Sequence, residues 1–372
     1  MRYIFFALVL LLFLGGNYYV FYRAWHVIPA NTIARTLLIV FAVVVLTSFF
    51  LVFVAGEIFP VSVTSVLYKI GTSWFFTFIY FLIINLLMDL VKVTRLVPAA
   101  TLSQYTRENW LSFGLIVGFV GLLMLCGYLK YGHKERVELP ITINKEGHKT
   151  KEVKIVALSD LHLGYGIGND ELSQWIQLVN KEEPDIVLIG GDIVDNGLRP
   201  VVEHKMDTLL REIKSKYGVY TILGNHEYIS DMNKSKNFFE KANIHLLRDS
   251  SVLIDSTFYV VGRDDRTNPN RKSLEELTAS LDKSKPIILL DHQPYHLEEA
   301  EANGIDFQFS GHTHRGQVWP ISLITDLMYE KSHGFLRKGN TQIYVSSGIG
   351  IWGGKFRIGS QSEYVVADMK LK

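Results

Sequence analysis

Acidic and histidine residues directly follow short apolar runs in the second half of the chain. The run Val153–Leu158 is rich in β-branched and aliphatic residues, which predicts a buried strand, and Asp160 and His162 come just after it. A carboxylate and an imidazole two residues apart at the carboxyl end of a strand face the crevice where α/β sheets usually bind ligands. Alone this pair is weak evidence, because surface loops also carry Asp and His.

Four further predicted strands end in the same way. Asp192 follows the run 185–190, Asn225 and His226 follow 217–223, His292 follows 286–290, and His312 and His314 follow 306–309. Each motif by itself fits an ordinary turn or a hydrogen-bonded loop histidine, but five such placements together indicate one site. The candidate metal ligands are Asp160, His162, Asp192, Asn225, His292, His312 and His314.

The chemistry of these side chains favours divalent transition metals. Carboxylate, imidazole and amide oxygen donors suit Mn²⁺, Fe or Zn²⁺ better than copper, and the histidines are too many for a Mg²⁺ or Ca²⁺ site. Seven donors exceed the needs of one ion. Two metal ions about 3.5–4 Å apart with a shared carboxylate would use them all. We expect two divalent cations, with Mn²⁺ favoured and Fe or Zn²⁺ as alternatives.

The segments around the motifs predict an α/β domain. Predicted helices at 172–180, 202–214, 234–242 and 273–281 alternate with the strands. Further strand-like segments at 317–319, 341–345 and 363–369 indicate a second sheet, hence a β-sandwich flanked by α-helices. Glycines stand beside several candidate ligands, where the backbone and a substrate must approach closely.

The first third of the chain predicts a membrane anchor. The chain has 372 residues, 48% of them hydrophobic, and about 20 apolar residues suffice to cross a bilayer. The four stretches long enough to do so are Tyr3–Tyr22, Thr36–Gly56, Ile70–Val91 and Leu111–Leu129. Tyr and Trp near their ends fit membrane interfaces. Asp89 lies close to Lys92 and to the predicted interface, which favours an ordinary interfacial carboxylate.

The composition changes between the two halves. Residues 133–151, with Pro140, are interpreted as a charged connector, and the boundary is placed near Leu139, giving an anchor at 1–138 and a catalytic domain at 139–372. The numbers of basic residues near the membrane are equal on the two sides of the predicted spans. Lys145 and Lys149 add to the side of the catalytic domain, which favours a cytoplasmic position for it, because cytoplasmic loops carry an excess of Lys and Arg. The net charge of +1, with no basic tract outside the membrane flanks, argues against a nucleic-acid partner. The single cysteine, Cys126, excludes a disulfide within the chain and a cysteine zinc cluster.

The motifs together resemble, in order and spacing, those of the calcineurin-like metallophosphoesterases. The resemblance covers roughly Lys154 to Met369. The segments Gly311–Gln317 and Tyr344–Gly350, with the anchor, are similar to a branch of membrane-associated bacterial phosphoesterases that includes YkuE. That branch often has Gly where this chain has Arg315, which bears on the substrate and leaves the core chemistry intact.

The resemblance implies a role for each residue. Asp160, His162 and His314 would hold one metal, Asp192 would bridge, and Asn225, His292 and His312 would complete the second. His226 would contact the phosphate and protonate the leaving oxygen. Asn225 and His226 would bind substrate, and metal-bound hydroxide would attack phosphorus. Arg315, which departs from the family pattern, is this chain's own candidate for substrate binding. Glu227 and Asp291 are candidates for orienting the histidines.

Two apolar segments bear on the substrate. Val318–Tyr329 and Ile349–Phe356 form either a small hydrophobic core or an apolar lip that faces the bilayer and admits an acyl chain. Lys355, Arg357 and Arg315 are candidate cations for a second phosphate or a nucleotide. The sequence therefore predicts a phosphoesterase of the bacterial inner membrane that cleaves a phosphoester or pyrophosphate bond, with a lipid or lipid precursor as the candidate substrate. The alternatives are a soluble substrate, with the helices as anchor only, and a non-catalytic membrane scaffold.

Overall fold

The computed structural model describes residues 2–145 and 151–371, so Lys149, used in the orientation prediction, lies outside the described residues. The chain forms two compact units, Met1–Tyr128 (unit 1) and Leu129–Lys372 (unit 2). The domain boundary near Leu139 stays a prediction.

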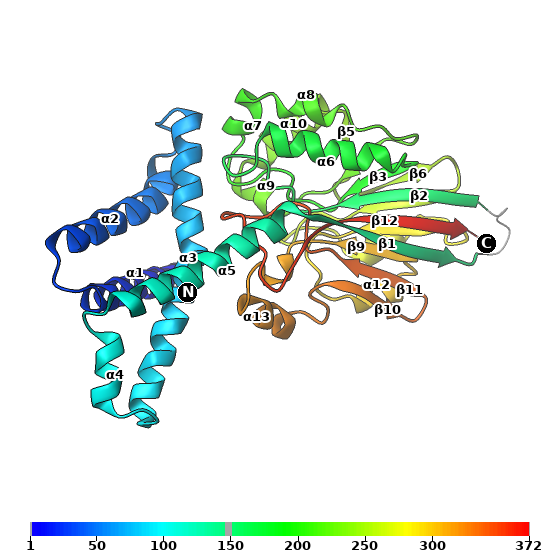
Figure 1. Cartoon of the computed structure of the whole chain (residues 1–372). Coiled ribbons are helices and arrows are strands. Elements are labelled where there is room, and N and C mark those ends of the chain that lie inside the picture. The colour runs from blue at the N-terminus through cyan, green and yellow to red at the C-terminus, as the bar shows by residue number, and fades with distance from the viewer. Residues whose placement is uncertain (1, 146–150, 372) are drawn as a thin grey trace. The chain divides into compact units, whose positions relative to one another are not determined.

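Unit 1 is helical (Figure 1). Its helices are α1 (Arg2–Val27), α2 (Thr32–Ala55), α3 (Val61–Thr94), α4 (Ala99–Thr106) and α5 (Trp110–Gly132), the last of which continues into unit 2. In the part of the chain that the structure describes, the helices α2, α3 and α5 are long and apolar enough to cross a membrane. The helix α1 covers the first predicted span but is not among these three, so a four-span anchor stays a prediction.

Aromatic side chains hold α1, α2 and α3 together. Phe13, Trp74 and Phe78 belong to one buried cluster, and the Trp74 indole donates a hydrogen bond to Asn17 Oδ1 at 2.8 Å. Asp89 is more than a lone interfacial carboxylate. It pairs with Arg23 at 3.1 Å and accepts a hydrogen bond from the Tyr19 hydroxyl, and both partners are on α1.

Unit 2 contains two six-stranded sheets, as the sequence predicts. The first has the order β1-β12-β2-β3-β4-β5 and the second β10-β11-β9-β8-β7-β6. The strands are β1 (Lys134–Ile143), β2 (Lys151–Leu158), β3 (Ile186–Ile189), β4 (Val219–Thr221), β5 (Ile244–Leu246), β6 (Ser250–Ile254), β7 (Phe258–Gly262), β8 (Ile287–Leu290), β9 (Phe307–Ser310), β10 (Gly334–Lys338), β11 (Thr341–Val345) and β12 (Ser362–Leu371).

Side chains along the central strands point alternately to the two faces of each sheet, which produces the layers of unit 2. In β2, Ile155 and Ala157 face the second sheet, whereas Val156 and Leu158 face helices on the outer side. The side chains of β8 alternate in the same way. Ile288 and Leu290 lie in the core between the sheets, and Leu289 lies in a cluster on the outer side. Both sheets are therefore covered by helices, and Figure 1 shows α6 and α10 over the first.

The helices of unit 2 are mostly short. They are α6 (Asn169–Lys181), α7 (Arg199–Glu203), α8 (Met206–Leu210), α9 (Asn225–Ile229), α10 (Met232–Lys241), α11 (Leu274–Thr278), α12 (Glu298–Ala302), α13 (Ile321–Met328) and the 3₁₀ turn η1 (His314–Gly316). In α6, Leu172, Trp175, Ile176 and Val179 are buried at helical spacing, which fixes this helix on the sheet.

Three sequence interpretations were wrong in detail. The supposed connector contains β1, in which Leu139, Ile141 and Ile143 are buried alternately, and Pro140 is tolerated because β1 is an edge strand. The helix expected at 202–214 is two short helices, α7 and α8. The segment 317–319 is not a strand and makes only an isolated bridge from Val318 to Ile358.

Candidate metal centre

The five motifs meet at one edge of unit 2. Strands β2, β3 and β4 are parallel neighbours in the first sheet, and β8 and β9 are parallel neighbours in the second. The carboxyl ends of parallel neighbours lie at the same sheet edge, and the two sheets face each other. All seven predicted ligands therefore come together, and none of them lies apart from the site.

The backbone at this edge is unusual. Five of the seven candidate ligands have positive φ: Asp160 (54°), His162 (47°), Asp192 (52°), His312 (71°) and His314 (48°). Residues other than Gly seldom adopt this conformation, and it clusters at functional sites, where the surrounding structure holds it in place.

One group of three donors comprises Asp160, His162 and His314. The Nε2 atoms of His162 and His314 lie 3.0 Å apart, and His314 Nε2 lies 3.6 Å from Asp160 Oδ1. The backbone N–H of His312 donates to Asp160 Oδ1 at 3.0 Å, which fixes the carboxylate.

The second group comprises Asp192, His292 and His312. His292 Nε2 lies 3.1 Å from Asp192 Oδ2 and 3.3 Å from Asn225 Oδ1. Asn225 Oδ1 also lies 2.8 Å from His312 Nδ1, so the amide oxygen joins this group. Asp192 Oδ2 is 3.8 Å from His162 Nε2 of the first group, which puts this carboxylate between the two groups.

These separations fit cation sites. Two ligand atoms at about 2.0–2.1 Å from one ion, and about 90–110° apart, lie about 2.9–3.4 Å from each other. The closest pairs in both groups are near this range. The donors are carboxylate, imidazole and amide oxygen, the set that Mn²⁺, Fe and Zn²⁺ accept.

Close packing leaves no room for side chains at two glycines beside the ligands. A Cβ atom on Gly224 would lie 2.1 Å from Asp192 Oδ1, and one on Gly311 would lie 2.4 Å from Asp160 Oδ2. These carboxylates sit against bare backbone, which holds them in position.

Burial and mutual charge perturb the titration of the site. Burial raises the pKa of Asp160. Burial would also raise the pKa of Asp192, but His292 and His226 hold it well below its usual range. Burial lowers the pKa of His312 to about 4, which favours the neutral imidazole that binds metal. Against the effect of burial, Asp192 raises the pKa of His292 well above its usual value.

Neighbouring oxygen atoms fix which nitrogen of His292 and of His162 faces the centre. His292 Nδ1 lies 2.7 Å from the carbonyl oxygen of Gly190, so Nδ1 donates and Nε2 is directed to the second group. His162 Nδ1 lies 3.3 Å from Asp195 Oδ1, which leaves Nε2 for the first group.

The sequence reasoning missed Asp195. This carboxylate is buried, and its Oδ1 lies 3.2 Å from His226 Nδ1 as well as 3.3 Å from His162 Nδ1. Although burial lowers the pKa of His226, Asp192 and Asp195 together raise it to about 9. The signal in the sequence was the second Asp in Gly191-Asp192-Ile193-Val194-Asp195, which looks like part of an ordinary turn.

Glu227 and Asp291 do not orient histidines directly. Glu227 accepts hydrogen bonds from the backbone N–H groups of Asp192, Val194 and Gly224, and so it fixes the loops that carry the ligands. Asp291 pairs with Arg263 at 3.3 Å and Arg271 at 3.1 Å.

Two of the three candidate substrate cations have structural partners. Arg357 is fully buried and donates to the carbonyl oxygens of His314, Ser347, Gly348 and Gly350, so it ties two loops of the site together. Lys355 pairs with Glu171. Arg315 is partly exposed next to His314 and remains the candidate for substrate binding.

The first of the two apolar segments is not a hydrophobic core. It contains α13, where Leu327 is 88% exposed, and Leu323, Ile324 and Met328 are each more than half exposed. Tyr329, at the end of α13, has its ring 6.3 Å from that of His312. The second segment is different, because Ile349 and Ile351 are buried in the core and do not form a lip.

Comparisons with known proteins identify the family to which the chain belongs. The family model described as calcineurin-like phosphoesterase matches residues 153–316. The chain is 33% identical over 265 residues to a protein named uncharacterized metallophosphoesterase from Helicobacter pylori strain J99, with 69% of each chain covered. It is 29% identical over 309 residues to the transmembrane protein with metallophosphoesterase domain of Danio rerio, covering 78% of this chain and 68% of that one. Among solved structures, the 5'-nucleotidase precursor of Thermus thermophilus aligns with a TM-score of 0.36 and 14% identity over 54% of this chain and 50% of that one.

The chain belongs to the calcineurin-like metallophosphoesterases, and the predicted resemblance to this superfamily is confirmed. It is a metal-dependent hydrolase with apolar helices of membrane-spanning length. The closer likeness to the YkuE branch stays a prediction.

Proposed function

We propose that the protein is a membrane-anchored phosphoesterase that uses two divalent cations to hydrolyse a phosphoester or pyrophosphate bond of a lipid or lipid precursor. Three groups of three donors lie at this edge, the third being His162 with Asp195 and His226. The observation that carries the proposal is that the Asp192 carboxylate lies between the first group and the two histidines of the second. Asp160, His162 and His314 would hold one cation, and Asn225, His292 and His312 the other. When bound, the cations would neutralise the phosphoryl oxygens and make water a nucleophile near neutral pH. Mn²⁺ is the favoured metal.

His226 is the proposed general acid. Its side chain is 13% exposed, so it can reach a substrate, and its elevated pKa keeps it protonated at pH 7. Asp195 holds its Nδ1, which directs Nε2 away from the carboxylate. His226 would protonate the leaving oxygen, and Asn225 and Arg315 would bind the phosphate with it.

Metal analysis of two matched variants tests the proposed bridge. Asp192→Asn should lose metal as well as activity, because the carboxylate serves both cations. Asp195→Asn removes a buried carboxylate three residues away that contacts the Nδ1 atoms of His162 and His226, and it should retain two metals per chain. Two metals still bound in Asp192→Asn protein would refute the bridging role.

The exposed apolar surface of α13 supports a lipid substrate. A row of leucine and methionine side chains in contact with water is costly, whereas in a bilayer each buried CH₂ contributes about 0.8 kcal/mol to binding. This surface adjoins Tyr329 and hence the second donor group.

Kinetics with two substrates test the lipid proposal. Leu327→Ser with Met328→Ser should raise KM for a lipid phosphoester in detergent micelles and leave hydrolysis of bis(p-nitrophenyl) phosphate unchanged. Val202→Ser with Leu253→Ser, which alters exposed apolar residues on other elements, is the control and should change neither. If the α13 variant slows both substrates equally, the segment has a structural role, and the soluble-substrate alternative becomes the better account.

We also propose a multi-pass arrangement in a bacterial inner membrane, with unit 2 on the cytoplasmic side. The support is the three membrane-length helices and the basic residues that follow the last span. Protease digestion of sealed inverted vesicles should remove unit 2. Protection of unit 2 there would place it on the opposite side.

A further inference from the structure

One stripe of α3 changes from apolar to charged along its length. Residues spaced three or four apart lie on one helix face. The members of the stripe that line cavities are Ile70, Trp74, Thr77, Phe81, Asn85, Asp89 and Lys92. Three cavities of unit 1 follow this stripe.

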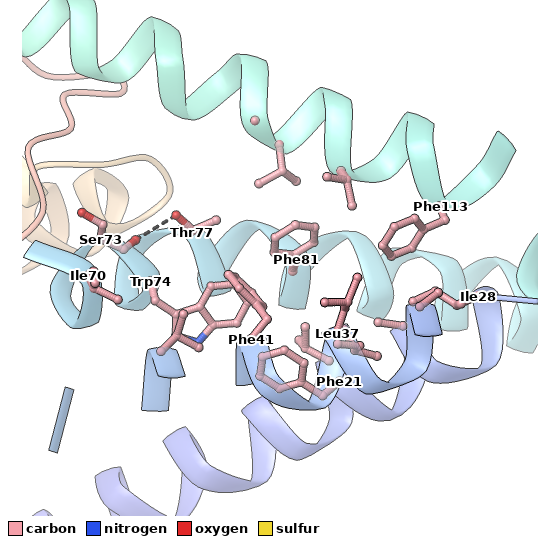
Figure 2. Close-up of a pocket in the computed structure, with 18 of the residues that line it drawn as sticks. Phe21, Ile28, Leu37, Phe41, Ile70, Ser73, Trp74, Thr77, Phe81 and Phe113 are labelled. Atoms are coloured by element: carbon pink, nitrogen blue, oxygen red, sulfur yellow. Dashed lines mark hydrogen bonds between the residues drawn. The ribbon is translucent and has the colours of Figure 1, made fainter. Parts of the chain in front are cut away.

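The first cavity is large and apolar. It has a volume of about 700 Å³, is lined from α1, α2, α3 and α5, and has no charged residue in its wall. Figure 2 shows Phe21, Phe41 and Trp74 around it. Two of its few polar side chains already have partners, because the Thr77 hydroxyl donates to the Ser73 carbonyl oxygen and the Trp74 indole donates to Asn17.

The apolar part of the stripe has the depth of one leaflet. From Ile70 to Phe81 it extends about 16 Å at about 1.5 Å per residue. Half of a hydrocarbon core of about 30 Å is close to that length. The volume is within the usual range of ligand sites, about 300–1,000 Å³.

The cavity at the other end of the stripe is cationic. It has a volume of about 420 Å³ and is lined by Arg23, Lys92 and Arg107 together with Asp89 and His26. Three cations against one carboxylate leave the wall with a net positive charge even when His26 is neutral. Only Arg23 among these cations has an ion pair in the described part of the chain, with Asp89 at 3.1 Å.

A small cavity of about 40 Å³ lies between the other two. It shares Arg23 with the cationic cavity and Phe81 and Phe113 with the apolar one. Arg23 also reaches Asn85, the next residue of the stripe, at 3.4 Å. The three spaces thus adjoin in the order apolar, narrow, cationic.

We propose that unit 1 binds an anionic glycerophospholipid of the bilayer, with one acyl chain in the apolar cavity and the headgroup phosphate against Arg23, Lys92 and Arg107. Basic pockets between membrane helices are typical sites for anionic headgroups. Ordinary bilayer lipid fills any apolar gap, but only an anionic lipid gains from the net positive charge at the end of this one. The proposal concerns binding and does not depend on the proposed catalytic activity.

The first experiment measures lipid selectivity of the wild-type protein. The full chain in uncharged detergent is titrated with dioleoylphosphatidylglycerol, dioleoylphosphatidylcholine or chain-free glycerol 3-phosphate, and bound lipid is counted by native mass spectrometry. We expect phosphatidylglycerol to bind at least about tenfold more tightly than phosphatidylcholine, because each cation near a headgroup favours anionic lipid. Equal affinity for the two lipids, or equally tight binding of glycerol 3-phosphate, would overturn the proposal.

A matched glycine pair on α5 tests the apolar cavity. Gly121 lines the cavity and Gly118 does not, and a Cβ atom on either would meet no atom within 4 Å. Both lie inside a helix, where replacing Gly removes a helix-weakening residue. Gly121→Leu should weaken phosphatidylglycerol binding several-fold, because the leucine side chain would occupy the space of the acyl chain. The Gly118→Leu variant should bind the lipid as the wild type does. Equal binding of phosphatidylglycerol by the two variants would contradict the proposal that an acyl chain occupies the apolar cavity.

A second pair tests the headgroup. Lys92→Gln with Arg107→Gln should reduce the preference for phosphatidylglycerol by about tenfold or more, since two cations are lost. Arg95→Gln removes a nearby cation that lines none of the three cavities and should retain the preference. A similar loss in both would mean that general surface charge, and not this pocket, attracts the lipid.

Discussion

Replacing Asp195 with asparagine separates orientation of the general acid from metal binding. The carboxylate is buried and contacts His226 and His162 through the same oxygen, at 3.2 and 3.3 Å. Asparagine has nearly the same shape but no charge. It can still accept one hydrogen bond, so the fold and the metal sites should survive.

The size of the effect follows from the charge that is lost. With Asp192 and Asp195 nearby, His226 has its pKa raised to about 9 and is almost fully protonated at pH 7. Asp192 remains in Asp195→Asn, so the pKa of His226 should fall from about 9 without passing below an ordinary value of about 6.5, at which roughly a quarter of the molecules would retain the proton at pH 7. Protonation alone then costs at most about fourfold in rate, and loss of orientation raises the total to about 10–100-fold, as is usual for groups that support a ligand.

The pH profile of turnover is the decisive measurement. In the wild type the rate should fall on the alkaline side near pH 9, and in Asp195→Asn that fall should move to a lower pH, between about 6.5 and 9, because Asp192 still raises the pKa of His226. Asp291→Asn is the matched control, because Asp291 is also buried beside a candidate ligand but pairs with arginines. It should leave the profile in place. A variant profile that overlays the wild type after scaling would refute the role of Asp195.

Two further predictions concern single side chains. His226→Ala should lower turnover about 10²–10⁴-fold with metal content unchanged. The loss should be smaller for p-nitrophenyl phosphate than for an alkyl phosphate, because the alkoxide leaving group needs a proton. Equal losses for the two substrates would indicate that His226 binds the phosphate instead. Burial lowers the pKa of Lys134 to about 6. Between about pH 6 and 10 the unfolded chain therefore binds this proton and the folded chain does not. In this range the free energy of unfolding rises with pH by up to about 1.4 kcal/mol per pH unit. Lys134→Met should flatten the dependence of the thermal unfolding midpoint on pH between 6 and 9; a slope equal to that of the wild type would show that other groups cause it.

The positions of the candidate ligands were predictable from the sequence. Parallel strands bring their carboxyl ends to one sheet edge, so polar residues after apolar runs had to meet whatever the details of the loops. The motifs also identified the superfamily, because their order along the chain is specific. What remained open was which side chains touch metal and which support them.

The supporting residues could not be predicted, because their roles depend on burial. Arg357 has the charge of a substrate-binding residue, and only the fold reveals that it is buried against carbonyl oxygens. The apolar residues of α13 looked equally like core or surface until their exposure was known. In β1, Pro140 suggested a connector, because the sequence does not show that the strand lies at an edge.

The central claim is that two divalent cations, held by the two donor groups, carry the hydrolysis. The most direct test is a metal titration of chelator-treated full-length protein, with bis(p-nitrophenyl) phosphate as substrate and Mn²⁺ added in steps. The account predicts no activity without metal and a rate that rises to a plateau at two equivalents of Mn²⁺ per chain. Full activity of the metal-free protein, or a plateau at one equivalent, would contradict it.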